Sequence, residues 1–153
     1  MATTTIIYLT VEGAKQGKFK GDVTSKSKPN TIRCWYYGYA INTTHDSSSG
    51  MASGKRQHGP IVIHKTINNS SPQFMQALIT NEVLKTVTIE LRTPTKAYYT
   101  ITLQDATISS IQHSVPEMDQ TPDALEEIEF VFKKITFKSA DGSIVGDDWM
   151  AHA

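Results

Sequence analysis

The sequence predicts a mainly β protein: a small antiparallel β-barrel or sandwich, with two packed sheets and one α-helix. Three observations predict this class. Most segments alternate apolar and polar residues, and they are rich in Thr, Ile, Val, Tyr and Phe. Only one segment has helical periodicity. A chain of 153 residues, 39% of them hydrophobic, can bury a core without disulfides, and the single Cys34 allows no intrachain disulfide.

The first strands are predicted over residues 3–11 and 31–41. In the first, Ile7, Leu9 and Val11 share one face, and a series of glycines follows. In the second, bulky side chains occupy both faces, with Ile32, Cys34 and Tyr36 on one and Arg33, Trp35 and Tyr37 on the other. Neither face of this strand is therefore expected to be freely solvated. We interpret Cys34 as a packed core thiol, because no cysteine-protease signature surrounds it.

Residues 42–59 contain almost no apolar side chains and are predicted to form a long extended loop. A connection of this length inside a compact domain is uncommon, and it is usually either functional or disordered. A mobile surface loop is the simplest interpretation. Within the loop, Lys55 and Arg56 could pair with acidic groups on a neighbouring copy of the chain. His45 and His58 bracket the loop, but a metal site is not supported, because no His-x-x-x-His spacing occurs.

The next strand covers residues 61–65, and the single helix follows it. Ser70 or Ser71 can cap this helix, and Pro72 suits its first turn. An apolar stripe follows the helical period and predicts the buried face: Phe74, Met75, Leu78 and Ile79. We expect the helix to end over residues 81–84.

The second half predicts a hairpin from residues 85–92 and 98–108, joined by a turn at residues 93–96. The apolar face changes parity near Gln104 and Asp105, which a β-bulge would explain. Residues 125–138 predict the last long strand, and its apolar face also changes midway. Such a change is expected at a barrel corner or at a boundary between protomers. We expect one domain over residues 1–153, with residues 139–153 as a C-terminal tail.

No catalytic residue, cofactor site or metal site emerges from the sequence. Nucleophile-elbow, Walker A and dinucleotide-binding patterns are all missing. Solvation accounts for the acidic groups Glu126, Glu127 and Glu129, and for Asp147 and Asp148 near the end. A net charge of zero, from 15 basic and 15 acidic residues, disfavours nucleic acid as a partner and favours self-association. No apolar run could span a bilayer, and no cleavable signal is visible, so we expect cytoplasmic synthesis and any export without a cleaved leader.

Two classes of function remain open from the residues alone. One is an assembly protein, whose bulky strand faces and neutral charge serve self-association. The other is a monomeric ligand-binding β-barrel, for example a carbohydrate binder that uses the aromatic residues between Trp35 and Tyr39. Aromatic clusters on strands more often mark packing or an interface.

A series of short segments, taken in order, resembles one known family. The segments are residues 13–17 (GAKQG), 54–58 (GKRQH), 60–63 (PIVI), 70–72 (SSP), 80–84 (TNEVL), 106–111 (ATISSI), 126–135 (EEIEFVFKKI) and 147–149 (DDW). Together they resemble the Hcp family, the haemolysin-coregulated tube proteins of bacterial type VI secretion. The resemblance covers essentially the whole chain, through the order and spacing of the segments rather than through one motif.

The resemblance implies a β-barrel with one helix, like that of phage tail tube proteins, that forms hexameric rings with a wide channel. Stacked rings form an inner tube that a contractile sheath expels, and the lumen can hold effectors. The implied partners are other copies of the chain, effectors, and sheath and spike or baseplate proteins. The long loop is implied to contact a neighbouring ring or protomer, through Asn42, His45, Ser49, Lys55, Arg56, Gln57 and His58. Tyr36 stands where some members have a small lumen-facing residue that touches cargo.

Overall fold

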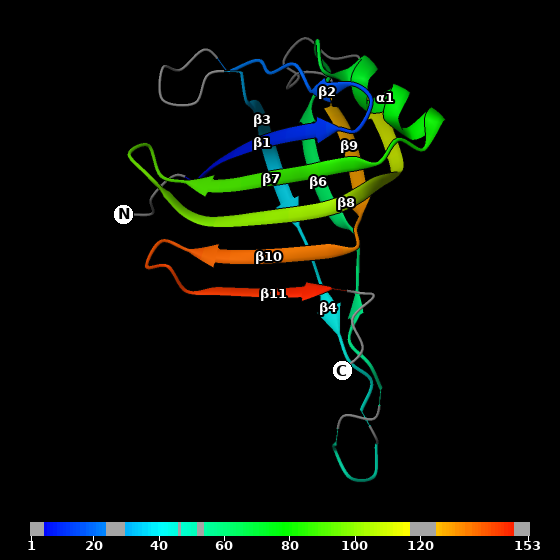
Figure 1. Cartoon of the computed structure of the whole chain (residues 1–153), viewed down its shortest axis with the longest axis vertical. Coiled ribbons are helices and arrows are strands. Elements are labelled where there is room, and N and C mark those ends of the chain that lie inside the picture. The colour runs from blue at the N-terminus through cyan, green and yellow to red at the C-terminus, as the bar shows by residue number, and fades with distance from the viewer. Residues whose placement is uncertain (1–4, 24–29, 46, 52–53, 117–124, 149–153) are drawn as a thin grey trace.

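The computed structural model describes residues 5–23, 30–45, 47–51, 54–116 and 125–148. Figure 1 shows a β-barrel with one helix at one end and an extended arm at the other. The first half contains β1 (Ile6–Gly13), β2 (Gly17–Lys18), β3 (Ile32–Gly38), β4 (Ile41–Asn42), β5 (Gln57–His58) and β6 (Ile61–Thr66). The second half contains α1 (Ser71–Thr80), β7 (Leu84–Arg92), β8 (Ala97–Ser114), β9 (Leu125–Val131), β10 (Lys134–Ser139) and β11 (Ile144–Asp148).

All strand pairs in the described part of the chain are antiparallel, and six of these strands close into a barrel. The sheet runs in the order β11-β10-β8-β7-β1-β3-β6-β9, and β9 pairs again with β8. This closure makes a barrel whose interior is filled by buried side chains, among them Leu9, Ile63, Ile89, Ile101, Ile128 and Phe130. Strands β10 and β11 extend the sheet from the first half of β8 (Figure 1). The predicted fold class is confirmed.

The helix begins where the sequence predicts. Ser70 is the N-cap residue, Pro72 lies in the first turn, and Asn81 ends the helix in the left-handed conformation, with φ of 54°. Its buried face consists of Phe74 and Ala77, and the Phe74 ring meets Phe19 edge-on, with 4.9 Å between ring centroids. The expected position of Ile79 in this face is wrong: its side chain is 70% exposed.

Both parity changes in the second half come from one corner of the barrel. Asp105 has φ of 51°, and this left-handed residue bends β8 between its β10-paired and β9-paired halves. Pairing with β7 stays in register across the bend, from Leu84↔Ala106 to Thr86↔Gln104, so the β-bulge expected near Gln104 and Asp105 is wrong at that position. A register shift occurs further along β8, between Ile108 and Ser110, in its pairing with β9. Opposite the corner, the strand expected over residues 125–138 divides into β9 and β10. The parity changes therefore mark a corner, one of the two interpretations that the sequence left open.

Two further segments differ from expectation. The strand predicted over residues 31–41 ends at Gly38, and its pairing with β6 shifts between Cys34 and Tyr36. The shift separates Tyr36 from the face of Ile32 and Cys34, so Tyr36 is exposed while Tyr37 packs against the core. Part of the expected C-terminal tail is strand β11, which pairs with β10 over its whole length.

Candidate assembly site

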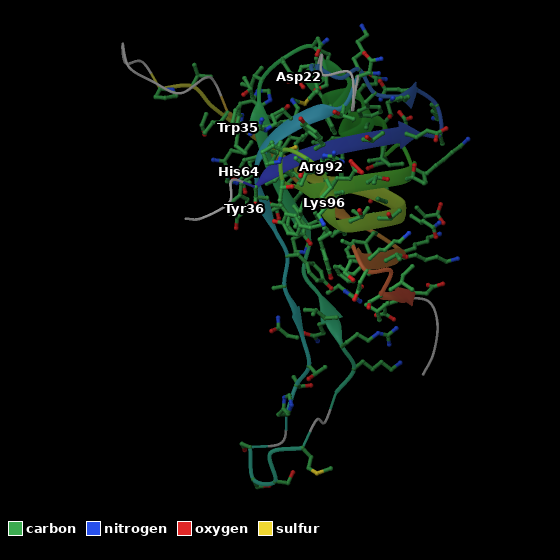
Figure 2. All side chains as sticks on the ribbon, turned by 90° about the vertical axis from the view of Figure 1, so that its left-hand side faces the viewer. Asp22, Trp35, Tyr36, His64, Arg92 and Lys96 are labelled. Carbon is green, nitrogen blue, oxygen red and sulfur yellow. The ribbon has the colours of Figure 1, made fainter. Side chains whose placement is uncertain are left out.

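The described residues between 41 and 58 form an arm that leaves the barrel at the end opposite α1, as Figures 1 and 2 show. Its two legs begin at β4 and β5, where Asn42 pairs with Gln57. The backbone N–H of Gly59 donates to the Ala40 carbonyl at 2.8 Å and closes the base. Every described arm residue from Ile41 to Lys55 is exposed. The arm therefore projects without support from the barrel core.

The base of the arm is held by a cluster that we name the arm clamp: Tyr39, Arg56, His58 and Asp147. Arg56 donates to both carboxylate oxygens of Asp147, with Nε–Oδ2 at 2.8 Å and Nη2–Oδ1 at 3.0 Å. The ring of His58 lies between Asp147 and Tyr39, at 2.6 Å from the Asp147 Oδ2 and 2.6 Å from the Tyr39 hydroxyl. Arg56 also donates to the Asp148 carbonyl at 2.9 Å. Strand β11 thus fixes the arm to the barrel.

The clamp has the electrostatics of a preformed ion pair. The hydrogen bonds from Arg56, and then those from His58, lower the pKa of Asp147 to about 2. Burial, followed by the charge of Asp147, raises the pKa of Tyr39. Asp147 is therefore ionised at neutral pH, while the Tyr39 hydroxyl stays protonated and can donate to His58. Hydrogen bonding to Asp147 also raises the pKa of Arg56, so the Arg56–Asp147 ion pair is fully charged at neutral pH.

The predicted loop residues occupy two different environments. Asn42, His45, Ser49, Lys55 and Gln57 are exposed, as a surface for contacts between copies requires. Arg56 and His58 instead bind Asp147 of their own chain, and the His58 side chain is 1% exposed. Asp147, interpreted from the sequence as a solvated acid, is the centre of the clamp. No sequence signal links it to Arg56, 91 residues away.

The predicted aromatic surface lies on β3, where Figure 2 shows Trp35, Tyr36 and His64 on one flank of the barrel. Tyr36 is 47% exposed and stacks on His64, with 4.5 Å between ring centroids. Its ring passes over Gly38, where an added Cβ would lie 2.6 Å from the Tyr36 hydroxyl oxygen. Trp35 is 55% exposed and donates from Nε1 to the Thr66 hydroxyl at 2.8 Å. This flank is a partly fixed aromatic surface.

A buried ion pair lies inside the barrel, between Lys65 of β6 and Glu126 of β9. The Lys65 Nζ and the Glu126 Oε1 are 2.5 Å apart, and both side chains are 0% exposed. Ser71 donates to the same carboxylate at 2.9 Å, and His113 lies 2.8 Å from its other oxygen. Burial alone would raise the pKa of Glu126, but hydrogen bonds from Lys65 and His113 outweigh it and lower the pKa. The expectation that Glu126 is solvated is wrong.

Cys34 is buried, and burial raises the pKa of its thiol, in line with the expected core thiol. Among the described residues, no group of three or more His, Cys, Asp and Glu side chains could hold a metal ion. Within the same part of the chain, no helix is long and apolar enough to cross a membrane.

Comparisons with known proteins agree with this geometry. The family model described as "Type VI secretion system effector, Hcp" matches residues 8–138. The "Major exported protein" of Pseudomonas aeruginosa PAO1 is 30% identical in an alignment 161 residues long, gaps included. The alignment covers 93% of this chain and 94% of that protein. A crystal structure of an Hcp protein has a TM-score of 0.87 at 23% identity, covering 97% of this chain and 100% of the other. An Hcp1 variant from E. coli has a TM-score of 0.84 at 22% identity, covering 94% and 99%.

The fold and the projecting arm define a barrel subunit of the type that builds tubes. The chain belongs to the Hcp family, the tube proteins of type VI secretion systems. The comparisons give no support to the alternative of a monomeric carbohydrate-type binder.

Proposed function

We propose that this chain forms hexameric rings that stack head to tail into the inner tube of a type VI secretion system. Family membership is the observation that carries the proposal. The asymmetric shape supports it, because an arm at one end of a barrel suits a heterologous contact, which repeats without limit along an axis. The chain then acts as a structural protein, without a catalytic step.

The arm is the stacking element in this proposal. Its described residues are polar and exposed, and its base is held by the arm clamp. Lys55 forms an ion pair with a neighbouring copy in this proposal. Arg56 acts indirectly, because it fixes the base of the arm to Asp147 of its own chain. A fixed base lowers the entropy that the arm loses when it docks.

The flank of Trp35, Tyr36 and His64 faces the lumen in this proposal and meets cargo there. Exposed aromatic rings suit contacts with the side chains of a transported protein. Other partners in this proposal are effectors, sheath proteins and spike or baseplate proteins. The tube itself is exported, which agrees with the name of the Pseudomonas relative, "Major exported protein".

The test is negative-stain electron microscopy of the purified, untagged protein, together with its mass by light scattering. Six-fold rings with a central hole are expected. Lys55→Glu is expected to weaken stacking and to leave the rings and the fold intact. Lys20→Glu is the control, because Lys20 is also exposed but lies near α1, with its backbone held by Gln73. A monomer that persists at high concentration would refute the ring, and normal stacking of Lys55→Glu would refute the role of the arm.

A further inference from the structure

An apolar cavity of about 470 Å³ lies at the barrel corner. It is lined by Val83, Asp105, Thr107, Val131, Phe132 and Lys133. Val83 and Val131 are 43% and 37% exposed, which is high for valines in a folded barrel. Asp105 and Lys133 are exposed and give the cavity a charged rim. Its volume is in the range of pockets that take one ligand or a few side chains.

The arm carries an apolar side chain that has no place in its own barrel. Met51 is 69% exposed and follows Gly50, whose φ of 74° turns the chain at the tip of the arm. The rest of the described arm beyond Ile41 is polar. An exposed methionine at the end of a polar projection is a good anchor, because its unbranched thioether adapts to irregular pockets.

The dimensions and positions of arm and cavity suit each other across two copies. Each leg of the arm has about nine residues and reaches at most about 30 Å, the length of a barrel strand of nine residues. In Figure 1 the arm descends on the same side of the barrel as the junctions α1–β7 and β9–β10, which contribute to the cavity. A second copy displaced along the long axis by about one barrel length therefore offers its cavity to the tip of the arm.

We propose that Met51 of one copy inserts into this corner cavity of the copy stacked next to it. The inference rests on the proposed stacking of rings, and it identifies the cavity of the neighbouring copy that receives the arm. Val83, Val131 and Phe132 receive the thioether. Lys55, on the returning leg of the arm, pairs with Asp105 on the rim. The contact joins different surfaces of the two copies, so it leaves a free arm and a free cavity at opposite ends of every stack.

Phe132 gives the contact a second consequence within the receiving copy. Its ring lines the cavity and also meets His58 of the arm clamp edge-on, with 5.3 Å between ring centroids. In each copy, the cavity that receives a neighbour's arm and the base of the copy's own arm therefore share the Phe132 side chain. Docking against Phe132 therefore adds packing beside the base of the receiving copy's own arm.

Cross-linking between two preparations tests the proposal. One preparation carries Met51→Cys and is labelled with ¹⁵N, and the other carries Val131→Cys and is unlabelled. They are mixed at high concentration with a mild oxidant, and mass spectrometry reads the linked peptides. Native Cys34 is 1% exposed and does not compete. We expect a disulfide between positions 51 and 131 that joins a labelled chain to an unlabelled one.

The matched control replaces Val131→Cys by Thr95→Cys, an exposed site on the β7–β8 turn at the other end of those strands. It is expected to give no link to position 51. In a second measurement, Met51→Asp raises the concentration needed for stacking about tenfold or more, and Met51→Leu leaves it nearly unchanged. Electron microscopy of every sample separates the possible failures. Stacked rings without the 51–131 link overturn this inference alone, whereas rings that never stack, or a persistent monomer, overturn the proposed function as well.

Discussion

Glu126→Gln should cost this barrel more stability than a conservative change usually does. The substitution keeps the size of the side chain but removes the charge that faces Lys65 at 2.5 Å. Both groups are 0% exposed, so water cannot replace the lost partner. Breaking one side of a buried ion pair typically costs about 3–5 kcal/mol. For a chain of this length, that loss lowers the melting temperature by about 6–20 °C.

The double variant Lys65→Met/Glu126→Leu separates the cost of an unpaired charge from the value of the pair. Apolar replacement of both partners is often neutral or stabilising. Here Ser71 and His113 each lose a hydrogen-bond partner, which costs about 1 kcal/mol apiece. The double variant should therefore lose about 2 kcal/mol, less than Glu126→Gln alone.

The assay is unfolding in guanidinium, followed by tryptophan fluorescence. Every variant is measured at the same set of protein concentrations, spanning a tenfold range, because assembly itself adds stability. Glu127→Gln is the control: this adjacent carboxyl is 39% exposed and lies 3.6 Å from His64, so we expect a change within about 0.5 kcal/mol. A loss below about 1 kcal/mol for Glu126→Gln, or a double variant less stable than the single one, would refute the reasoning.

Four further predictions concern the arm clamp and the exposed and buried side chains of β3. Asp147→Asn should weaken the clamp by only about 0.5–1 kcal/mol, because the Arg56–Asp147 pair is partly exposed. The backbone amides of Gln57 and His58 should then exchange their hydrogens with solvent about 2–5-fold faster. Unchanged hydrogen exchange would contradict the role of the clamp. In the unchanged protein the pKa of Asp147 is lowered to about 2 from its ordinary value of 3.8. The stability that ionised Asp147 contributes should therefore be complete above about pH 4 and be lost as the pH falls through about 2. Hydrogen exchange of the same two amides, measured against pH, checks this. Cys34 should resist alkylation at pH 8 until the protein unfolds, because burial raises the pKa of its thiol; rapid labelling of the folded protein argues against the core position. Tyr36→Ala should lower stability by no more than about 1.5 kcal/mol, the upper value for an aromatic stack, while cargo retention falls; a larger loss of stability would show that Tyr36 is structural.

The sequence pattern predicts the barrel, because its strands alternate and each parity change records the bend of a strand at the corner. The helix is also predictable at both ends, since Pro72 and Asn81 suit its first turn and its C-cap. The exposed Ile79 could not be foreseen: helical spacing gives a stripe, but of its apolar side chains only Phe74 is fully buried, with Ala77 beside it and Leu78 packed at the edge of the core. Tertiary packing decides how much of a stripe is covered.

The buried ion pair was available in the sequence and was missed. Lys65 has the parity of Ile61 and Ile63, and Glu126 has the parity of Ile128 and Phe130. Two opposite charges on inward-facing positions of two strands are a signal that they pair, and in the structure Lys65 and Glu126 are direct cross-strand partners. Base rates for acidic residues, which favour solvation, hid this signal.

The arm clamp, in contrast, depends on geometry that no local pattern records. A polar arm has too little apolar surface to bury, so packing cannot set its direction. The direction must come from its base, where one carboxylate on β11 holds both Arg56 and His58. Among the described strands, β11 pairs on one side only, with β10, which leaves its other edge open to a further contact. It follows that any contact that orders β11 also orders the base of the arm.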